Sequence, residues 1–318
     1  MKVVIPGGSG QVGRVLAPAF HGEGHEVVVL SRSPAPAPWR VVAWDGETAG
    51  PWEAELDGAD VVFNLAGASV NCRYGAANRR EIMDSRVRST RVLGQALTAA
   101  ARPPRVWLQA STATIYAHRY DAANGESTGI LSGHEVRLPD TWRFSIDVAT
   151  AWERAAREAV LPATRRVLMR TAIVLAPGAG GGFDLLLRLV RWGFGGRQGD
   201  GRQFVSWIHD RDLVRAVHWL IDHEELEGPV NVAAPEPLPN ADFMATLRGA
   251  WGARLALPAT EAMLTVGALA LRTETELVLK SRRVVPERLL ESGFTFTYPE
   301  WGAAAVDLCR RWRQGEGR

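Results

Sequence analysis

The sequence has very few of the side chains that most often build disulfides, metal centres and acid–base pairs. Among 318 residues there are two cysteines and four tyrosines, and Lys2 and Lys280 are the only lysines. The two cysteines, Cys72 and Cys309, lie far apart and lack the spacing of metal ligands. They argue against a disulfide framework and against a metal site. They fit a reducing compartment, so we expect a cytoplasmic protein.

Excess charge and long apolar runs are also absent. The 37 basic residues nearly balance the 35 acidic ones, and the arginines are scattered rather than clustered, which does not favour a nucleic-acid partner. No apolar run of about 20 residues could span a bilayer, and no signal-peptide pattern precedes the first expected strand, so we expect no membrane partner. With 46% apolar residues, the chain has enough material for a globular core.

Short apolar segments alternate with segments of helical spacing up to Leu175. After it, glycine-rich loops flank one expected helix, and a strand followed by a helix returns at residues 205–221. This alternation is typical of an α/β fold with a Rossmann-type, doubly wound parallel sheet, and the remainder predicts a smaller, mainly helical C-terminal lobe. We expect residues 1–176, completed by about 205–235, to form the first domain, and residues 177–204 and 236–318 to form the second lobe. Strands are expected at residues 2–6, 25–32, 41–44, 60–67, 105–112, 165–175 and 228–234, and helices at 11–20, 86–101, 148–160 and 184–192.

A glycine cluster, GGSGQVG, follows the first expected strand and leads into the first expected helix. It contains Gly7, Gly8, Gly10 and Gly13. A turn of this kind brings backbone N–H groups and a helix N-terminus close to a diphosphate. Glycine-rich turns are common for purely structural reasons. The strand before this one and the helix after it nevertheless favour dinucleotide binding.

The end of the second expected strand indicates which dinucleotide is preferred. Sites for NAD place an acidic residue there to bind both ribose hydroxyls, whereas this chain has Ser31 followed by Arg32. A carboxylate would repel a 2′-phosphate, while a serine hydroxyl and a guanidinium accept one. These two residues predict NADP(H), with the alternative that Arg32 is a solvated loop cation.

Further motifs resemble a known protein family. The stretches GGSGQVG, NLAG at 64–67, ASTATIY at 110–116 and WIHDRDL at 207–213 are similar to extended short-chain dehydrogenases/reductases of the NAD-dependent epimerase/dehydratase type. SRVRST at 85–90 and SRRVVPERLLESGFTFTYP at 281–299 resemble a subgroup of uncharacterised "epimerase family" proteins with a C-terminal extension. The resemblance implies a Rossmann core, a small C-terminal lobe and NADP(H) as cofactor. We expect the cofactor to contact Gly7, Ser9, Gly10, Gln11, Val12, Gly13, Ser31, Arg32, Leu65, Ala66, Gly67, Ser111 and Arg170.

The chain lacks the catalytic pair of the wider family. That family carries a Tyr-x-x-x-Lys pair on a helix, in which the lysine cation lowers the pKa of the tyrosine, and a serine or threonine on the fifth strand. The best match puts Ala149 at the tyrosine position and Glu153 at the lysine position. An alanine cannot transfer a proton, and a carboxylate raises the pKa of a neighbouring phenol. The usual acid–base mechanism therefore cannot be carried over.

Three side chains are candidates for proton transfer in its place. Thr112 matches the hydroxyl position of the family, with an ordinary strand residue as the alternative. Tyr116, like Tyr120, is a tyrosine close to the expected site. Glu153 is an acid–base group, a partner of the nicotinamide ribose, or one half of a salt bridge on the helix surface.

Two other residues have two interpretations each. His209 titrates near neutrality or orients loops, with Asp210 or Asp212 capping the next helix. Arg170, at the end of the sixth expected strand, holds an anionic substrate or pairs with a buried acid.

Two functions fit this sequence. The first is an NADP(H)-dependent oxidoreductase or epimerase-like enzyme acting on a small carbonyl or hydroxyl compound, with the hydride chemistry supplied by the nicotinamide. The second is a non-catalytic NADP(H)-binding redox sensor, favoured by the missing pair. Association into a homodimer is left open. Four aromatic residues in the C-terminal lobe also favour the sensor if they are exposed to a partner protein, namely Phe294, Phe296, Tyr298 and Trp301. Their alternation is equally typical of a half-buried strand.

Overall fold

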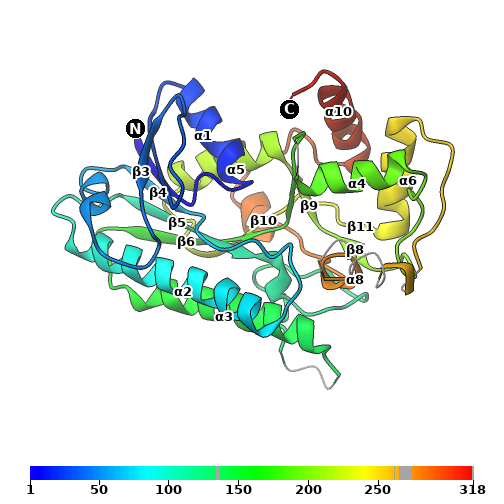
Figure 1. Cartoon of the computed structure of the whole chain (residues 1–318), viewed down its shortest axis with the longest axis horizontal. Coiled ribbons are helices and arrows are strands. Elements are labelled where there is room, and N and C mark those ends of the chain that lie inside the picture. Colours follow the sequence, from blue (N-terminus) through cyan, green and yellow to red (C-terminus); the bar gives the residue numbers. More distant parts are fainter. Residues whose placement is uncertain (134–136, 179, 261, 265–273, 317–318) are drawn as a thin grey trace.

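The computed structural model describes residues 1–133, 137–178, 180–260, 262–264 and 274–316. In these residues the largest sheet has seven parallel strands in the order β10-β6-β5-β4-β1-β2-β3 (Figure 1). This order confirms the expected α/β fold with a Rossmann-type, doubly wound sheet. The strands are β1 (Lys2–Pro6), β2 (Glu26–Ser31), β3 (Arg40–Ala43), β4 (Val61–Asn64), β5 (Val106–Thr112), β6 (Arg165–Thr171) and β10 (Gly228–Val232).

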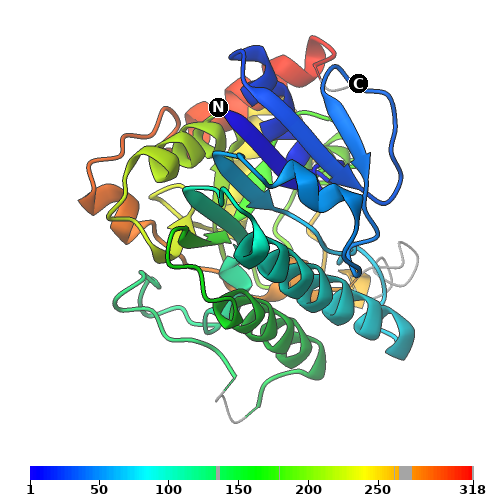
Figure 2. The ribbon, with the colours of Figure 1, turned by 90° about the vertical axis from the view of Figure 1, so that its left-hand side faces the viewer.

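Helices cover both faces of this sheet, as Figures 1 and 2 show. One face carries α1 (Gly13–Gly22) and α5 (Asp210–Asp222), and the other carries α2 (Ala76–Ala99) and α3 (Asp140–Glu158), which lie side by side. Alternate residues of one strand serve the two layers. Val3 and Ile5 of β1 pack on the α1 side, and Val4 packs on the α2 side. Because both faces are buried, the strands are almost continuously apolar.

The strand order brings two loops together at one edge of the sheet. β1 lies between β2 and β4, so the loops after β1 and β4 leave the sheet as neighbours. The N–H of Leu65 donates to the carbonyl of Pro6 at 2.8 Å and joins them. Open α/β sheets bind their ligands at this place, the carboxyl edge beside the point where the strand order reverses.

After β6 the chain leaves the large sheet. Ala172 still donates its N–H to Val232, but Ile173 donates to Ser206. The expected single strand at 165–175 is therefore wrong, because the backbone changes partner at Ala172. Its second half is β7 (Ile173–Leu175), which pairs with β9 (Trp207–His209).

The second lobe is mainly helical, as expected. Its apolar core gathers around Phe183, Phe243 and Trp301, and Trp207 of β9 packs into the same cluster. The elements that follow β7, other than β9, β10 and α5, are α4 (Gly182–Arg191), β8 (Phe204–Val205), β11 (Leu238–Pro239), α6 (Asn240–Trp251), α8 (Glu276–Leu279), α9 (Glu287–Glu291) and α10 (Trp301–Arg313). Since β10 pairs with β6, segment 228–232 returns to the large sheet, and we propose to keep the division at 1–176 with 205–235 against 177–204 with 236–318.

Two helices begin earlier than the sequence predicts. α2 begins at Ala76 instead of 86, and α3 begins at Asp140 instead of 148. The first turns of α2 are exposed and polar, so they show no apolar periodicity. The C-terminal aromatics do not form a strand either. Phe294 and Trp301 are buried, which removes them as exposed docking residues.

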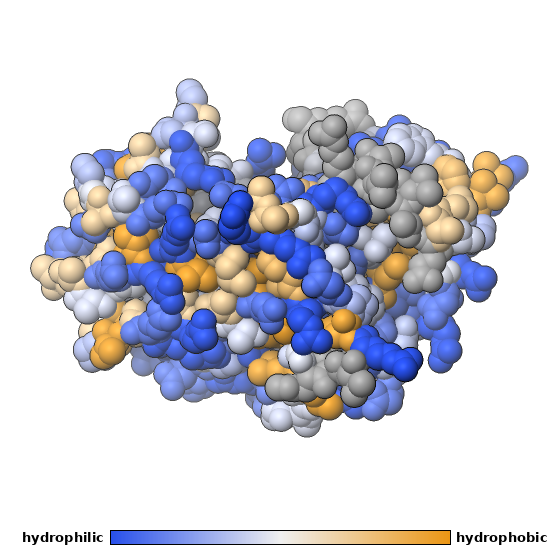
Figure 3. All heavy atoms as spheres, turned by 60° about the horizontal axis from the view of Figure 1, so that its bottom comes forward, coloured by the Kyte–Doolittle hydropathy of each residue, from blue (hydrophilic) through white to orange (hydrophobic). Residues whose placement is uncertain are grey.

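No helix in the described ranges is long and apolar enough to cross a bilayer. On the face that carries α2 and α3, hydrophilic side chains are interspersed with small, separate apolar patches (Figure 3).

Candidate cofactor site and active site

The glycine turn after β1 is shaped by two close approaches of backbone. Gly7 has a φ of +76°, and a Cβ atom there would lie 2.7 Å from the Cα of Ala66 in the neighbouring loop. A Cβ atom on Gly13 would lie 2.1 Å from the carbonyl oxygen of Gly8. Both positions require glycine. A side chain at Gly7 would push the turn away from the loop after β4, and one at Gly13 would push the start of α1 away from the turn at Gly8.

Gly10 has a different environment. A Cβ atom on Gly10 would meet only the carbonyl oxygen of Gly7, at 3.4 Å, an ordinary contact. The protein itself therefore does not need glycine at this position. The absent side chain leaves room over the turn at the place where a diphosphate approaches the backbone of a Rossmann fold.

The start of α1 is free to bind an anion. Its N-cap residue, Val12, has no side chain that could accept from the helix amides, and the first turn holds no acidic residue. The amides and the positive end of the helix dipole therefore have no internal counter-charge from this helix. With the open face of Gly10, this geometry fits a dinucleotide diphosphate.

Ser31 and Arg32 lie at the end of β2, beside this turn. The Ser31 side chain is buried, and its hydroxyl oxygen lies 3.2 Å from that of Ser9 in the glycine turn. The Arg32 side chain is 62% exposed and pairs with Glu81 at 3.2 Å. An exposed pair of this kind contributes about 0–1 kcal/mol, so a phosphate can displace the carboxylate at little cost.

Two more contacts surround the turn. Gln11 donates from its side-chain amide to the carbonyl of Gly180 at 2.5 Å and so links the turn to the second lobe. Gly67, in the loop after β4, lies against the Arg86 guanidinium. A Cβ atom on Gly67 would be 3.0 Å from the guanidinium carbon. The predicted contacts Leu65, Ala66 and Gly67 thus face the turn across the edge of the sheet, and their role toward a cofactor stays a prediction.

The position of the missing catalytic pair is occupied by a buried polar network. Glu153 is 2% exposed, and its carboxylate accepts from the Ser111 hydroxyl at 2.7 Å and from two Arg170 nitrogens at 2.8 and 3.0 Å. A third cation, Arg157, donates to it at 3.0 Å. Glu153 is therefore the acid that Arg170 pairs with, one of the two interpretations that the sequence leaves open.

The network continues from Arg170 to Tyr116. Arg170 donates to the Tyr116 hydroxyl at 2.9 Å, and that hydroxyl donates to the side-chain oxygen of Asn231 at 2.9 Å. The Tyr116 ring is buried against Ala149, so the tyrosine fills space at the position where the helix lacks one.

Charges in this network follow from burial and pairing. Burial alone would raise the pKa of Glu153, but hydrogen bonds from Arg170 and its positive charge outweigh burial and lower that pKa. Burial likewise disfavours the charged form of Arg170, yet Glu153 raises its pKa above the ordinary value. Burial raises the pKa of Tyr116, and Arg170 offsets this only in part. At neutral pH the network is thus an ion pair with a protonated phenol.

These states bear on the three candidates for proton transfer. Glu153 is a fully bonded carboxylate and Tyr116 is buried, so the geometry favours positioning roles for both. Thr112 is half-buried, and its hydroxyl accepts from the N–H of Thr114 at 3.2 Å, which leaves the hydroxyl proton available. Tyr120 is exposed and lies farther along the chain, outside this network.

Comparison with known proteins identifies the family. A model of the NAD dependent epimerase/dehydratase family matches residues 3–133. The human epimerase family protein SDR39U1 is 32% identical over 313 residues, which cover 97% of this chain and 99% of that protein. The chain belongs to the SDR39U1-like epimerase family. The resemblance found in the sequence is thereby confirmed.

Other members of this epimerase family are similar over the same length. YfhF of Bacillus subtilis is 29% identical over 311 residues, which cover 97% of this chain and 98% of that protein. The crystal structure of human SDR39U1 (isoform 2) with NADPH has a TM-score of 0.84 at 30% identity, covering 98% of this chain and 99% of that chain. Residues 259–308 match a domain of unknown function, DUF1731.

This C-terminal segment of the family reaches the candidate active site. Lys280 is buried and donates from Nζ to the carbonyl of Thr114 at 2.6 Å, and Arg282 donates from Nε to the Thr114 hydroxyl at 3.0 Å. Sequence reasoning did not place either residue here, because each contact joins positions more than 160 residues apart. The one available signal was that Lys280 is one of only two lysines in the chain.

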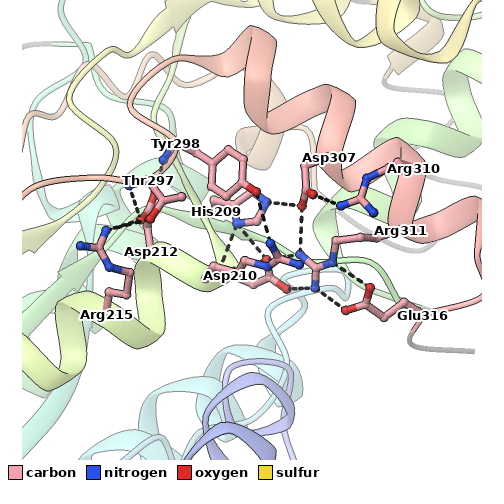
Figure 4. A network of polar contacts seen from close by, with 11 residues as sticks. His209, Asp210, Asp212, Arg215, Thr297, Tyr298, Asp307, Arg310, Arg311 and Glu316 are labelled. Atoms are coloured by element: carbon pink, nitrogen blue, oxygen red, sulfur yellow. Dashed lines mark hydrogen bonds and ion pairs between the residues drawn. The ribbon is translucent and has the colours of Figure 1, made fainter.

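His209 serves the fold. It is the N-cap of α5, and its ring accepts from the N–H of Arg211 at 3.2 Å. Asp210, one of the two aspartates expected to cap this helix, accepts from the same N–H at 3.0 Å. The other ring nitrogen of His209 lies 3.1 Å from a carboxylate oxygen of Asp307 in α10. The Tyr298 ring stacks on the His209 ring, with 3.9 Å between the ring centroids (Figure 4). Burial lowers the pKa of His209. These contacts favour the loop-orienting interpretation over catalysis.

The same region anchors the C-terminal helix, as Figure 4 shows. Arg311 of α10 donates to both oxygens of Asp210 at 2.8 and 2.7 Å and also pairs with Glu316. Asp212 accepts from the N–H groups of Thr297 and Tyr298. Both aspartates of the WIHDRDL motif therefore bind the C-terminal lobe.

Proposed function

We propose that this chain is an NADP(H)-dependent oxidoreductase or epimerase-like enzyme acting on a small carbonyl or hydroxyl compound. The observation that carries the proposal is the glycine turn, where Gly7 and Gly13 are required by packing but Gly10 leaves space beside an uncapped helix. The human relative crystallised with NADPH supports the choice of cofactor. A cytoplasmic location is part of the same proposal, and association into a homodimer stays open.

The residues present fit the cofactor. The amides of Gly10, Gln11 and Val12 would hold the diphosphate, and Ser31 with Arg32 would hold the 2′-phosphate. The nicotinamide, when bound, supplies hydride transfer. The cofactor would also be bordered by residues at the same edge of the sheet, namely Leu65, Ala66 and Gly67 after β4 and Ser111 near the end of β5.

The proposed active site would have a buried ion-pair network on one side and the hydroxyl group of Thr112 on the other. The buried network of Glu153, Arg170 and Tyr116 fixes the end of β6 against α3, so the ends of the strands cannot shift. Thr112, at the end of β5, is the hydroxyl left to bond a substrate oxygen, with water as the proton source. We therefore assign positioning roles to Glu153 and Tyr116 and substrate contact to Thr112.

The cofactor is tested by binding. We expect the dissociation constant for NADPH to be at least tenfold lower than that for NADH, measured by quenching of tryptophan fluorescence. Arg32→Ala should weaken NADPH binding and leave NADH binding unchanged. Arg88→Ala is the matched control, because Arg88 is also an exposed arginine paired with a glutamate but lies on α2. Equal affinity for the two cofactors in the wild-type chain would refute the proposal.

A non-catalytic redox sensor is the second candidate, and one observation favours it. Glu153 is held as a carboxylate and Tyr116 is buried, so neither provides the acidic proton that the family pair supplies. NADPH consumption is measured against a panel of aldehydes, ketones and quinones. Turnover that depends on Thr112 supports the enzyme. Tight cofactor binding without turnover, and with partner affinity that changes between NADP+ and NADPH, supports the sensor.

A further inference from the structure

Arg86 is a guanidinium in an unusual position. Its side chain projects from α2 against the loop after β4, and its Nη1 donates to the carbonyl of Ala68 in that loop at 3.0 Å. The same nitrogen donates to the carbonyl of Ile82, one turn earlier in α2, at 3.1 Å. Its guanidinium carbon lies 5.0 Å from the centre of the Trp152 ring. The backbone carbonyls and the aromatic face hold the guanidinium plane in one orientation.

No carboxylate of the described residues pairs with Arg86, and in the same residues its Nε and Nη2 make no hydrogen bond. The nearby acids are engaged elsewhere. Glu274 pairs with Arg73 at 3.4 Å, and Glu276 pairs with Arg282 at 3.2 Å. Burial lowers the pKa of Arg86 to about 10. A half-buried cation without a counter-ion is costly, and an anion that arrives with a ligand removes that cost.

A second polar group, Tyr74, lies near Arg86. Tyr74 is 7% exposed, and its ring packs on Ile82, one helical turn before Arg86, and on Val148 of α3. Tyr74 is close enough to Arg86 for a charge on its phenol oxygen to act on the guanidinium. Burial raises the pKa of Tyr74 to about 12, so its phenol stays protonated and can donate a hydrogen bond.

The C-terminal segment positions this tyrosine. The Glu274 carboxylate accepts from the N–H of Tyr74 at 2.8 Å, and Glu276 accepts from the Ser145 hydroxyl at 2.5 Å beside the Tyr74 ring. Residues of the domain of unknown function therefore hold the loop that faces Arg86. This gives the segment a physical role: it fixes the position of Tyr74 near Arg86.

We propose that Arg86 and Tyr74 form the substrate subsite for an anionic group, a carboxylate or a phosphate, carried by the small molecule that the enzyme converts. The free Nε and Nη2 edge of Arg86 matches two oxygens of such a group, and the Tyr74 hydroxyl donates to a neighbouring oxygen. The inference rests on the proposed function, because it names the substrate class of that site. The same chemistry has a second source, the diphosphate of the cofactor, so the test separates the two.

The experiment uses the full chain with pyruvate and inorganic phosphate as probes, at constant ionic strength set with sodium chloride. Each anion is titrated with and without NADPH, and thermal unfolding midpoints give its affinity. The variants are Arg86→Gln, Arg86→Lys and Tyr74→Phe, and the matched control is Arg88→Gln on the exposed face of the same helix. Near-UV circular dichroism of each variant checks that it is folded.

We expect at least one anion to raise the midpoint of the wild-type chain and of Arg88→Gln. The affinity for that anion should fall about 10- to 100-fold in Arg86→Gln, as expected for the loss of charge-assisted hydrogen bonds, and less in Arg86→Lys and Tyr74→Phe. The NADPH dissociation constant should stay within about threefold of wild type in all of them.

Three results would overturn the proposal. The first is no response of the wild-type chain to either anion. The second is an Arg86→Gln variant that responds like the wild type. The third is an NADPH affinity at least tenfold weaker in Arg86→Gln, which would assign the anion to the cofactor. Because NADPH binding by the wild-type chain is measured separately, a failure of the proposed function is distinguished from a failure of the subsite.

Discussion

The buried pair of Glu153 and Arg170 makes a specific prediction about stability. In Glu153→Gln the amide oxygen can still accept from one side, but the NH₂ group faces the N–H donors of Arg170 and Arg157. Hydrogen bonds to charged groups contribute about 1.5–3 kcal/mol each, so the variant should lose about 2–3 kcal/mol of unfolding free energy. Glu153→Ala removes both oxygens and leaves the Arg170 guanidinium, which is 6% exposed, without a counter-ion, which costs about 3–5 kcal/mol.

The assay is urea unfolding followed by the fluorescence of the tryptophans, with the slope of free energy against urea checked for constancy. Glu158→Gln is the matched control. Glu158 lies on the same helix and also pairs with an arginine, Arg91, but it is 43% exposed, so its loss should cost less than about 1 kcal/mol. Both substitutions remove one negative charge from α3, and they differ in burial.

The pH dependence follows from the lowered pKa of Glu153. A carboxyl whose pKa is lower in the folded chain adds stability above its unfolded pKa of about 4.3, and this contribution is lost as the pH falls through the folded pKa. The difference between the wild-type chain and Glu153→Gln should therefore be constant from neutral pH down to about 5, and it should shrink in more acid solution. If Glu153→Gln unfolds like the wild type but no longer binds NADPH or turns over, Glu153 acts on the ligand and the positioning role is wrong.

Two further predictions concern the glycine turn and the C-terminal helix. Gly10→Ala should keep the unfolding midpoint of the free chain but weaken NADPH binding about tenfold or more. Gly13→Ala should lower the midpoint itself, because its Cβ would lie 2.1 Å from the Gly8 oxygen, whereas the Cβ at position 10 stays 3.4 Å from the Gly7 oxygen. Comparable midpoints for the two free variants would contradict this reading of the turn. Arg311→Met leaves Asp210 and Asp307 without their shared cation and should cost about 3–5 kcal/mol at pH 7 in urea unfolding. Burial alone would raise the pKa of Asp307, but a hydrogen bond from Arg310 and nearby positive charges, Arg311 among them, outweigh burial and lower that pKa. The cost should therefore shrink as the pH falls below about 4, and a loss independent of pH would show that packing rather than charge holds α10.

Most strands of the sheet were predictable because a parallel strand that is buried on both faces consists of consecutive apolar residues. Val3, Val4 and Ile5 are all buried, so the whole run is apolar and marks its own place. The partner change at Ala172 was not predictable, because both halves of segment 165–175 are apolar and only a distant strand, β9, decides where one half pairs. The early start of α2 was missed because its first turns are mostly exposed and carry no periodic signal.

The candidate site divides in the same way. The glycine turn is local, so its spacing sufficed to locate a turn in which Gly7 and Gly13 prove sterically required. The ion pair of Glu153 and Arg170 joins a helix to a strand, and the sequence left Arg170 between two interpretations. The contacts of Lys280 with Thr114 and of Glu274 with Tyr74 span still larger separations, and no periodicity or motif encodes them.

The substitutions at the catalytic pair are compensated by residues from other elements. Ala149 leaves space on α3, and the Tyr116 ring from the loop after β5 packs into it. Glu153 places a negative charge where the family has a positive one, and Arg170 of β6 neutralises that charge with two hydrogen bonds. A damaged enzyme would leave a cavity or an unpaired charge at these positions, and each would cost several kcal/mol. The described structure shows a filled and neutral arrangement instead. The absence of the pair is therefore compensated within the fold, and acid–base chemistry in the proposed enzyme has to come from groups outside the pair, such as the hydroxyl of Thr112.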